Sequence, residues 1–143
     1  MVAGGVVVAD DETGFAGAAD RHRLGAERSA ELLAREPETS LSNPVLDADN
    51  RSFSDTWGAA RSEGRSHEGT DIFAEQGTYV VSPTDAVVMR TGVSDRGGNH
   101  VFTLGPGGER YYFAHLDTID PNMSLGMVIE AGAILGTVGN TGN

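Results

Sequence analysis

The chain has 143 residues, a length that suits one domain with a short attachment and allows a proper hydrophobic core. Its formal net charge of −11, with no basic stripe, argues against nucleic acid as a partner. Because there is no cysteine, a disulfide framework and a thiolate metal site are excluded. The 20 glycines and the 6% of aromatic residues favour a turn-rich, mainly β protein over a helical bundle.

Residues 1–36 predict a lead-in followed by a helix. The apolar run at 6–9 is too short to cross a membrane, and it lacks the preceding basic residues of an export signal. From about 15 to 35 the chain is rich in Ala, Leu, Glu and Arg with a loose 3.6-residue period, which predicts a helix that Pro37 ends. With few large apolar residues, this helix is expected to pack only weakly. Residues 37–50 have the composition of a linker.

Residues 51–143 predict a series of short β-strands separated by turn residues. The apolar segments fall near 53–57, just after Asp71, and at 79–81, 86–89, 100–104, 110–116, 127–129 and 134–138. Short, evenly spaced strands are typical of an antiparallel β-sheet sandwich or barrel-like sheet. Similar segments at 76–83 and 130–136 suggest an internal duplication, of the duplicated hybrid motif type.

His67 and Asp71 set an imidazole and a carboxylate four residues apart. On a helix they would share one face, as in helical zinc sites. In an extended segment, residues i and i+4 also project to one face. The flanking Gly64 and Gly69 favour a loop that runs into a strand. Imidazole nitrogen and carboxylate oxygen suit zinc, although a surface histidine and a strand-end aspartate with no joint task would give the same pattern.

In the segment 111–116, strict alternation would place Tyr111, Phe113 and His115 on one face of a strand. It would place Tyr112, Ala114 and Leu116 on the other face. A histidine at the end of such a strand is, taken alone, more often structural than catalytic.

Five blocks follow one another in a fixed order. They are F-x-D-x-W-G-A-x-R, H-E-G-T-D-I, G-T-x-V-x-S-P-T-D-A-V-V, Y-F-A-H-L and G-x-x-I-E-A-G-A-I-L-G-T-V-G-N-T-G. Over about residues 53–143, this order and spacing resemble the M23 family of zinc metallopeptidases, the lysostaphin-like peptidoglycan endopeptidases. The resemblance implies that zinc-activated water attacks a peptide bond of the cell wall, without a covalent intermediate.

The resemblance implies roles for individual residues. His67 and Asp71 match the zinc ligands of the family's H-x-x-x-D motif, and His115 matches a histidine that helps activate the water or stabilise the oxyanion. Arg61 matches an arginine often found before that motif, with no firm role. His100 matches no catalytic position and is expected to be a strand residue. His22, among arginines, is not expected to bind metal.

The chain departs from the family pattern at its carboxyl end. The family completes its site with an H-x-H block after the G-N-T-G turn, and the second of these histidines is the third zinc ligand. Here no histidine follows His115. We expect a truncated domain, 51–143, that lacks its carboxyl-terminal part and has little activity by itself, since a catalytic zinc needs three protein ligands.

The sequence leaves one alternative function open, a non-catalytic cell-wall binding or hydrolase-activator module of the same fold. Two further classes, a carrier and a sugar-phosphotransferase domain, fit less well. All 10 basic residues are arginine, so a carrier's attachment lysine is missing, and a phosphotransferase site with paired histidines has no use for Asp71. For the peptidase, the resemblance implies peptidoglycan peptides as partners and an extracytoplasmic location. It does not indicate the bond cleaved or the oligomeric state.

Overall fold

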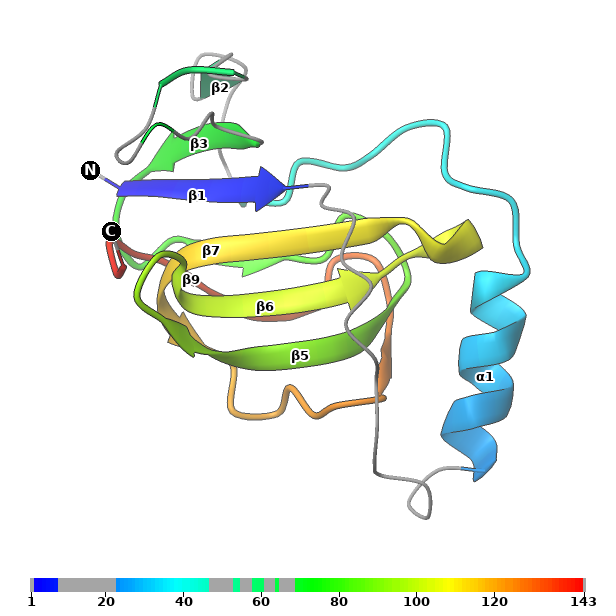
Figure 1. The fold of residues 1–143 in the computed structure, drawn as a ribbon. Helices are drawn as coiled ribbons and strands as arrows, with labels where there is room; N and C mark the ends of the chain where they lie inside the picture. Colours follow the sequence, from blue (N-terminus) through cyan, green and yellow to red (C-terminus); the bar gives the residue numbers. More distant parts are fainter. Residues whose placement is uncertain are drawn as a thin grey trace.

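A computed structural model describes residues 2–7, 23–46, 53–54, 58–60, 64 and 69–142, with only the backbone at 2–7, 23–25 and 53. These residues form one α-helix, one 3-10 turn and a set of β-strands (Figure 1). In chain order they are β1 (Val2–Val7), α1 (Arg23–Leu33), β2 (Phe53–Ser54), β3 (Thr70–Ala74), β4 (Tyr79–Val81), β5 (Ala86–Ser94), β6 (Gly98–Leu104), η3 (Pro106–Gly108), β7 (Arg110–Ile119), β8 (Val128–Ile129) and β9 (Ile134–Val138).

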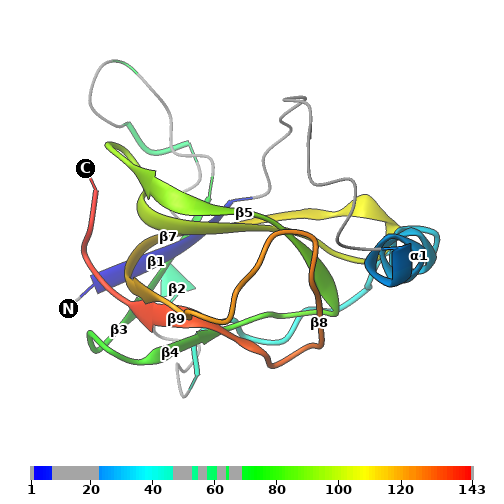
Figure 2. The ribbon, with the colours of Figure 1, turned by 90° about the horizontal axis from the view of Figure 1, so that it is seen from below.

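The strands form one curled antiparallel sheet. Its main path runs β2-β3-β1-β7-β6-β5-β8, and β9 joins it by pairing with both β7 and β4. Because β9 leaves the main path, β4 and β9 lie below β5 and β7 and make the sheet resemble a half-barrel (Figure 2). The predicted mainly β, barrel-like antiparallel fold is therefore confirmed, and each strand expected between 53 and 138 is present within a few residues.

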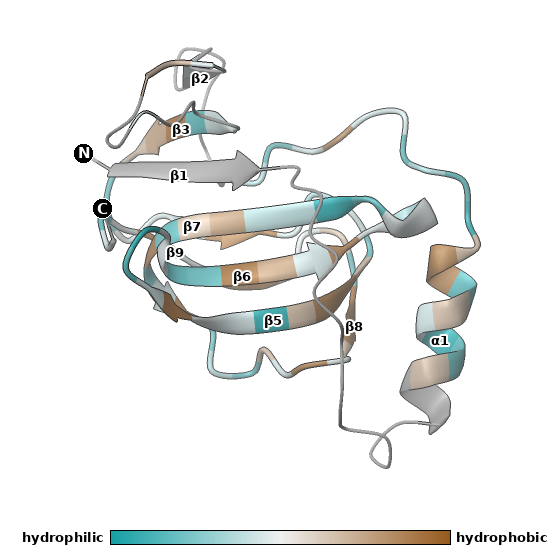
Figure 3. Cartoon of the chain, in the orientation of Figure 1, coloured by the Kyte–Doolittle hydropathy of each residue, from teal (hydrophilic) through white to brown (hydrophobic). Residues whose placement is uncertain are grey.

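The hydrophobic core lies inside this curl. Figure 3 shows hydrophobic residues along the middle of β6 and β7. The buried cluster draws on most of the strands and consists of Val45, Ile72, Val80, Ala86, Val88, Val101, Tyr111, Phe113, Leu116, Ile129, Leu135 and Val138. Burial of these side chains is the main favourable term in folding.

Strand β1 lies inside the sheet, where the sequence predicted only a lead-in. It pairs with β3 along one edge and with β7 along the other, antiparallel in both cases. The segment consists of three valines, two glycines and one alanine and has no strong pattern of its own, so its structure depends on the two open strand edges that accept it. Those edges exist only in the folded sheet.

Helix α1 packs more closely than its composition suggests. The Leu32 side chain is 1% exposed, and the helix lies against η3 and β8. In the segment after the helix, Val45 is 2% exposed and forms a β-bridge with Val80. Among the described residues, no helix is long and apolar enough to cross a membrane.

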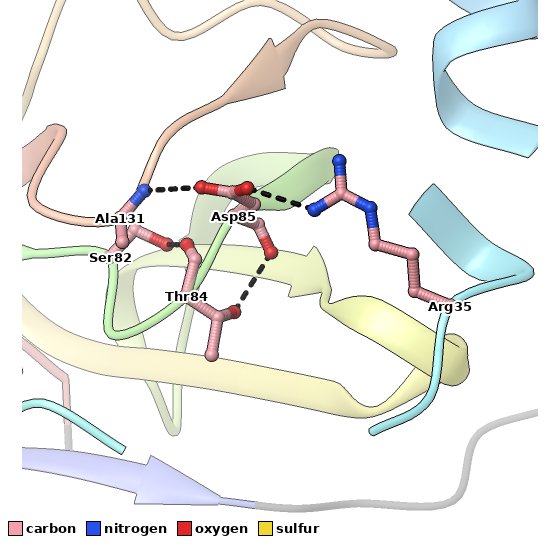
Figure 4. A network of polar contacts seen from close by, with 5 residues as sticks. All are labelled: Arg35, Ser82, Thr84, Asp85 and Ala131. Carbon is pink, nitrogen blue, oxygen red and sulfur yellow. Dashed lines mark hydrogen bonds and ion pairs between the residues drawn. The ribbon is translucent and has the colours of Figure 1, made fainter. Parts of the chain in front are cut away.

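Asp85 connects the segment after α1 to the sheet. Its carboxylate accepts a hydrogen bond from the backbone N–H of Ala131 at 3.0 Å and forms a salt bridge with Arg35 at 3.0 Å (Figure 4). The hydroxyls of Ser82 and Thr84 donate to the backbone carbonyls of Thr84 and Asp85, which fixes the turn between β4 and β5. The Ala131 hydrogen bond, followed by Arg35, holds the pKa of Asp85 below its ordinary value of 3.8.

Replacing Asp85 should weaken the fold in a pH-dependent way. Because the folded-state pKa is depressed, the carboxylate stabilises the fold above the unfolded pKa of 3.8, and this contribution is lost as the pH falls through the folded value. Both side chains of the salt bridge are partly exposed, so we expect Asp85→Asn to cost only about 0.5–1 kcal/mol at pH 7. Urea denaturation at pH 7 and below pH 4 should show that the difference shrinks in acid. A difference that stays constant would contradict this assignment.

Replacing Thr103 by valine should leave the stability unchanged or raise it. The Thr103 hydroxyl is fully buried, and among the described residues it has no hydrogen-bond partner. A buried hydroxyl without a partner costs about 1–3 kcal/mol, a penalty that the isosteric valine removes. The matched control is Val101→Thr, which places a hydroxyl at a buried position on the same strand and should destabilise the fold. Urea denaturation of both variants tests the pair.

Candidate active site

Asp71 and the start of the His115 segment lie on one row across the sheet. In the pairing register, Asp71 of β3 is opposite Gly5 of β1, and Gly5 is opposite Ala114 of β7. Side chains of residues that are paired in this way project from the same face of a sheet. Two strand spacings separate the Asp71 and Ala114 backbones by about 10 Å. The Asp71 side chain is 8% exposed, so this carboxylate lies in a largely buried position beside β1.

A β-bulge sets the direction of His115. Between the pairs Asn99–Leu116 and Val101–Phe113, β6 contributes one residue and β7 contributes two, Ala114 and His115. His115 has a φ of 60°, the only positive φ of a non-glycine among the described residues. Its backbone N–H donates to the carbonyl oxygen of Gly97 at 2.7 Å. Bulges re-aim side chains, and a left-handed non-glycine residue stores about 1–2 kcal/mol of strain.

The strict alternation predicted for this strand is wrong after Phe113, because the bulge interrupts it. The sequence predicted Leu116 on the face of Tyr112 and Ala114, but Leu116 belongs to the buried core together with Tyr111 and Phe113. The extra residue moves the phase of the strand by one position after Phe113. His115 is therefore released from the core face that strict alternation assigned to it.

The His115 ring is held by a segment that follows β9. Its Nδ1 lies 2.8 Å from the carbonyl oxygen of Thr141. The Thr141 hydroxyl in turn donates to the Leu116 carbonyl at 2.6 Å and accepts the Asn99 backbone N–H at 2.9 Å. Sequence analysis did not single out Thr141 or Asn99. The only sequence signal for Thr141 was the G-N-T-G turn, whose position against the bulge depends on the tertiary structure, and Asn99 had no such signal.

The remaining histidines and Arg61 fall into two groups. His67, Arg61 and His22 lie outside the described residues. His100 is in β6, as expected, and is 5% exposed. Its Nδ1 lies 3.0 Å from the carbonyl oxygen of Gly98.

Asp71 lies in strand β3, which begins at Thr70, so the extended conformation expected for Asp71 is confirmed.

The donor types present suit a zinc site only in part. Asp71 offers carboxylate oxygen in a largely buried position, which zinc accepts. In the described part of the chain, which leaves out His67, no three His, Cys, Asp or Glu side chains gather closely enough to hold one metal ion.

The curled antiparallel sheet is similar to the folds of known peptidases. Residues 65–143 match Peptidase family M23, more than half of the chain. The chain therefore belongs to Peptidase family M23.

Several known proteins resemble this chain. The L-Ala–D-Glu endopeptidase of Bacillus subtilis is 39% identical over 93 residues, which are 64% of this chain and 28% of that protein. The chain thus spans under a third of that relative's length. The catalytic domain of lysostaphin from Staphylococcus simulans is 29% identical with a TM-score of 0.57, over 63% of this chain and 69% of that one. A Pseudomonas aeruginosa protein described as a candidate M23 peptidase is 29% identical with a TM-score of 0.62, over 82% and 48% of the two chains.

The strain at His115 predicts an unusual order of stability for its variants. Both His115→Gly and His115→Ala lose the ring and its contact with Thr141, so their difference reports the backbone. Because φ is 60°, the glycine variant should be more stable than the alanine variant by about 1 kcal/mol. At an ordinary strand position, a glycine variant is less stable than the alanine variant. The control is therefore the pair Phe102→Gly and Phe102→Ala on β6, in which the alanine variant should be the more stable. Equal stability of the two His115 variants would show that the bulge relaxes.

Proposed function

We propose that this chain belongs to the catalytic domain of a zinc-dependent endopeptidase that cleaves peptide bonds of bacterial peptidoglycan. The observation that carries the proposal is the placement of Asp71 and the bulged His115 on strands either side of β1, in a chain of Peptidase family M23. The relatives named as an endopeptidase and as the antimicrobial peptidase lysostaphin support this substrate class.

His67 and Asp71 are the proposed metal ligands, and His115 is the proposed catalytic residue. Zinc, when bound, supplies Lewis-acid polarisation of the scissile carbonyl and makes water more acidic. The His115 Nδ1 is beside the Thr141 carbonyl, which can only accept a hydrogen bond, so the proton of the neutral ring is on Nδ1. Nε2 then carries the lone pair and can take a proton from the attacking water.

The family's third ligand comes from an H-x-H block, which residues 1–143 do not contain. The described histidine nearest the bulge in the pairing register, His100, is buried with Nδ1 beside the Gly98 carbonyl, and we assign it no ligand role. We therefore propose that this chain alone binds zinc weakly and has little peptidase activity. As the substrate is the cell wall, we place the enzyme outside the cytoplasm.

Zinc titration and wall lysis test this proposal together. The 143-residue chain should show no tight stoichiometric zinc, whereas the same chain extended through an H-x-H block should bind zinc tightly and clear a peptidoglycan suspension. In the extended chain, His67→Ala or Asp71→Ala should weaken zinc binding by at least about 10–100-fold, because loss of even an outer-shell partner costs that much.

His22→Ala is the matched control, since it removes an imidazole to which we assign no role, and it should change neither readout. Tight zinc binding by the 143-residue chain would mean that another residue completes the site. Zinc binding with wall adsorption but no cleavage by the extended chain would favour the non-catalytic module instead.

A further inference from the structure

We propose that Thr141 is a positioning residue, which secures the bulge in β7 with its hydroxyl and selects the tautomer of His115 with its carbonyl. The significance of that tautomer for proton transfer depends on the proposed function. The structural assignment does not depend on it.

The Thr141 hydroxyl joins the two strands beside the bulge. It donates to the carbonyl oxygen of Leu116 on β7 and accepts the backbone N–H of Asn99 on β6. The pairing of β6 and β7 is irregular here, because two residues of β7 face one residue of β6. Buried or half-buried backbone groups near such an irregularity need partners from outside the ladder. One hydroxyl supplies both a donor and an acceptor, which a methyl group cannot do.

The side chain of Asn99 completes this arrangement. Its Nδ2 donates to the carbonyl oxygens of Leu116 at 3.1 Å and Asp117 at 2.8 Å. The Leu116 carbonyl thus accepts from both Thr141 and Asn99, filling its two lone pairs. The backbone that follows His115 is therefore held from two sides.

Close packing brings the Thr141 carbonyl to the ring. A Cβ added at Gly98 would overlap the backbone of Thr141, and one added at Gly142 would overlap the backbone of Gly98. Both glycines also have a positive φ, of 58° and 83°. Glycine at these two positions allows the segment after β9 to lie directly on the turn between β5 and β6.

The contact from this carbonyl decides the protonation pattern of the ring. The Nδ1 of His115 lies 2.8 Å from an oxygen that cannot donate, so the neutral ring carries its proton on Nδ1. An unconstrained neutral histidine prefers the proton on Nε2, so the fold selects the less common tautomer. Hydrogen bonds to one ring nitrogen fix the tautomer in metal and catalytic sites in the same way.

Nitrogen-15 NMR of the imidazole rings tests this assignment on the 143-residue chain without zinc or substrate. At a pH where His115 is neutral, we expect the wild-type ring to show the Nδ1–H pattern. Thr141→Val keeps the shape but removes the hydroxyl, so it should loosen the segment and produce a mixture with the Nε2–H form. Thr141→Ser keeps the hydroxyl and should restore the wild-type pattern.

Thr118→Val is the matched control, because it makes the same change further along β7, where the hydroxyl contacts Thr137. It should leave the His115 spectrum unchanged. If Thr141→Val does not fold, Thr141→Ala, which adds no new contact, replaces it with the same expected mixture.

Two results would overturn the assignment. One is an Nε2–H ring at His115 in the wild type, and the other is an unaltered Nδ1–H ring in a folded variant without the hydroxyl. Neither measurement requires peptidase activity. An inactive extended chain with the expected tautomer would therefore count against the proposed function and leave the role of Thr141 intact.

Discussion

The mismatch of one residue between β6 and β7 is the constraint on which the candidate site depends. Two residues of β7 face one of β6, and His115 adopts a φ of 60° to absorb the difference. Without the bulge, the regular alternation of β7 would direct His115 to the face of Tyr111 and Phe113, inside the core. The strain is balanced by hydrogen bonds from outside the ladder, and above all by those of Thr141 and Asn99.

The rest of the fold holds the two sides of the candidate site in register. The strand β1 pairs with both β3 and β7, so the Asp71 and Ala114 positions are aligned through Gly5. The core behind the sheet keeps β7 from shifting, since Phe113 and Leu116 on either side of the bulge are both buried. Away from the site, α1 packs against η3 and β8, and Asp85 links Arg35 to the backbone of Ala131. A carboxylate and an imidazole thus lie on rigid strands instead of flexible loops, which favours precise chemistry.

Much of the fold could be predicted because it follows from local patterns. Apolar segments such as 79–81 and 134–138 are bounded by turn residues, and they form β4 and β9 with the predicted extent. Asp71 was expected on a strand and lies there. The burial of Leu32 and the strand at Val2–Val7 could not be predicted, because each depends on a surface or edge contributed by distant residues. The candidate site was inferred from the order of its motifs and stays a prediction. Thr141 was missed because a threonine in a glycine-rich turn has no distinctive local signal.

The sequence by itself determined the β-rich class, the order of the strands along the chain and membership of a peptidase family, because periodicity, turn residues and motif spacing are local properties. Only the tertiary structure decided which way His115 leaves its strand. The number of residues between two cross-strand pairs fixes the phase of a strand, and that number is a relation between β6 and β7, absent from either segment alone. The same holds for the ring's proton, whose position depends on a carbonyl 26 residues away in the chain.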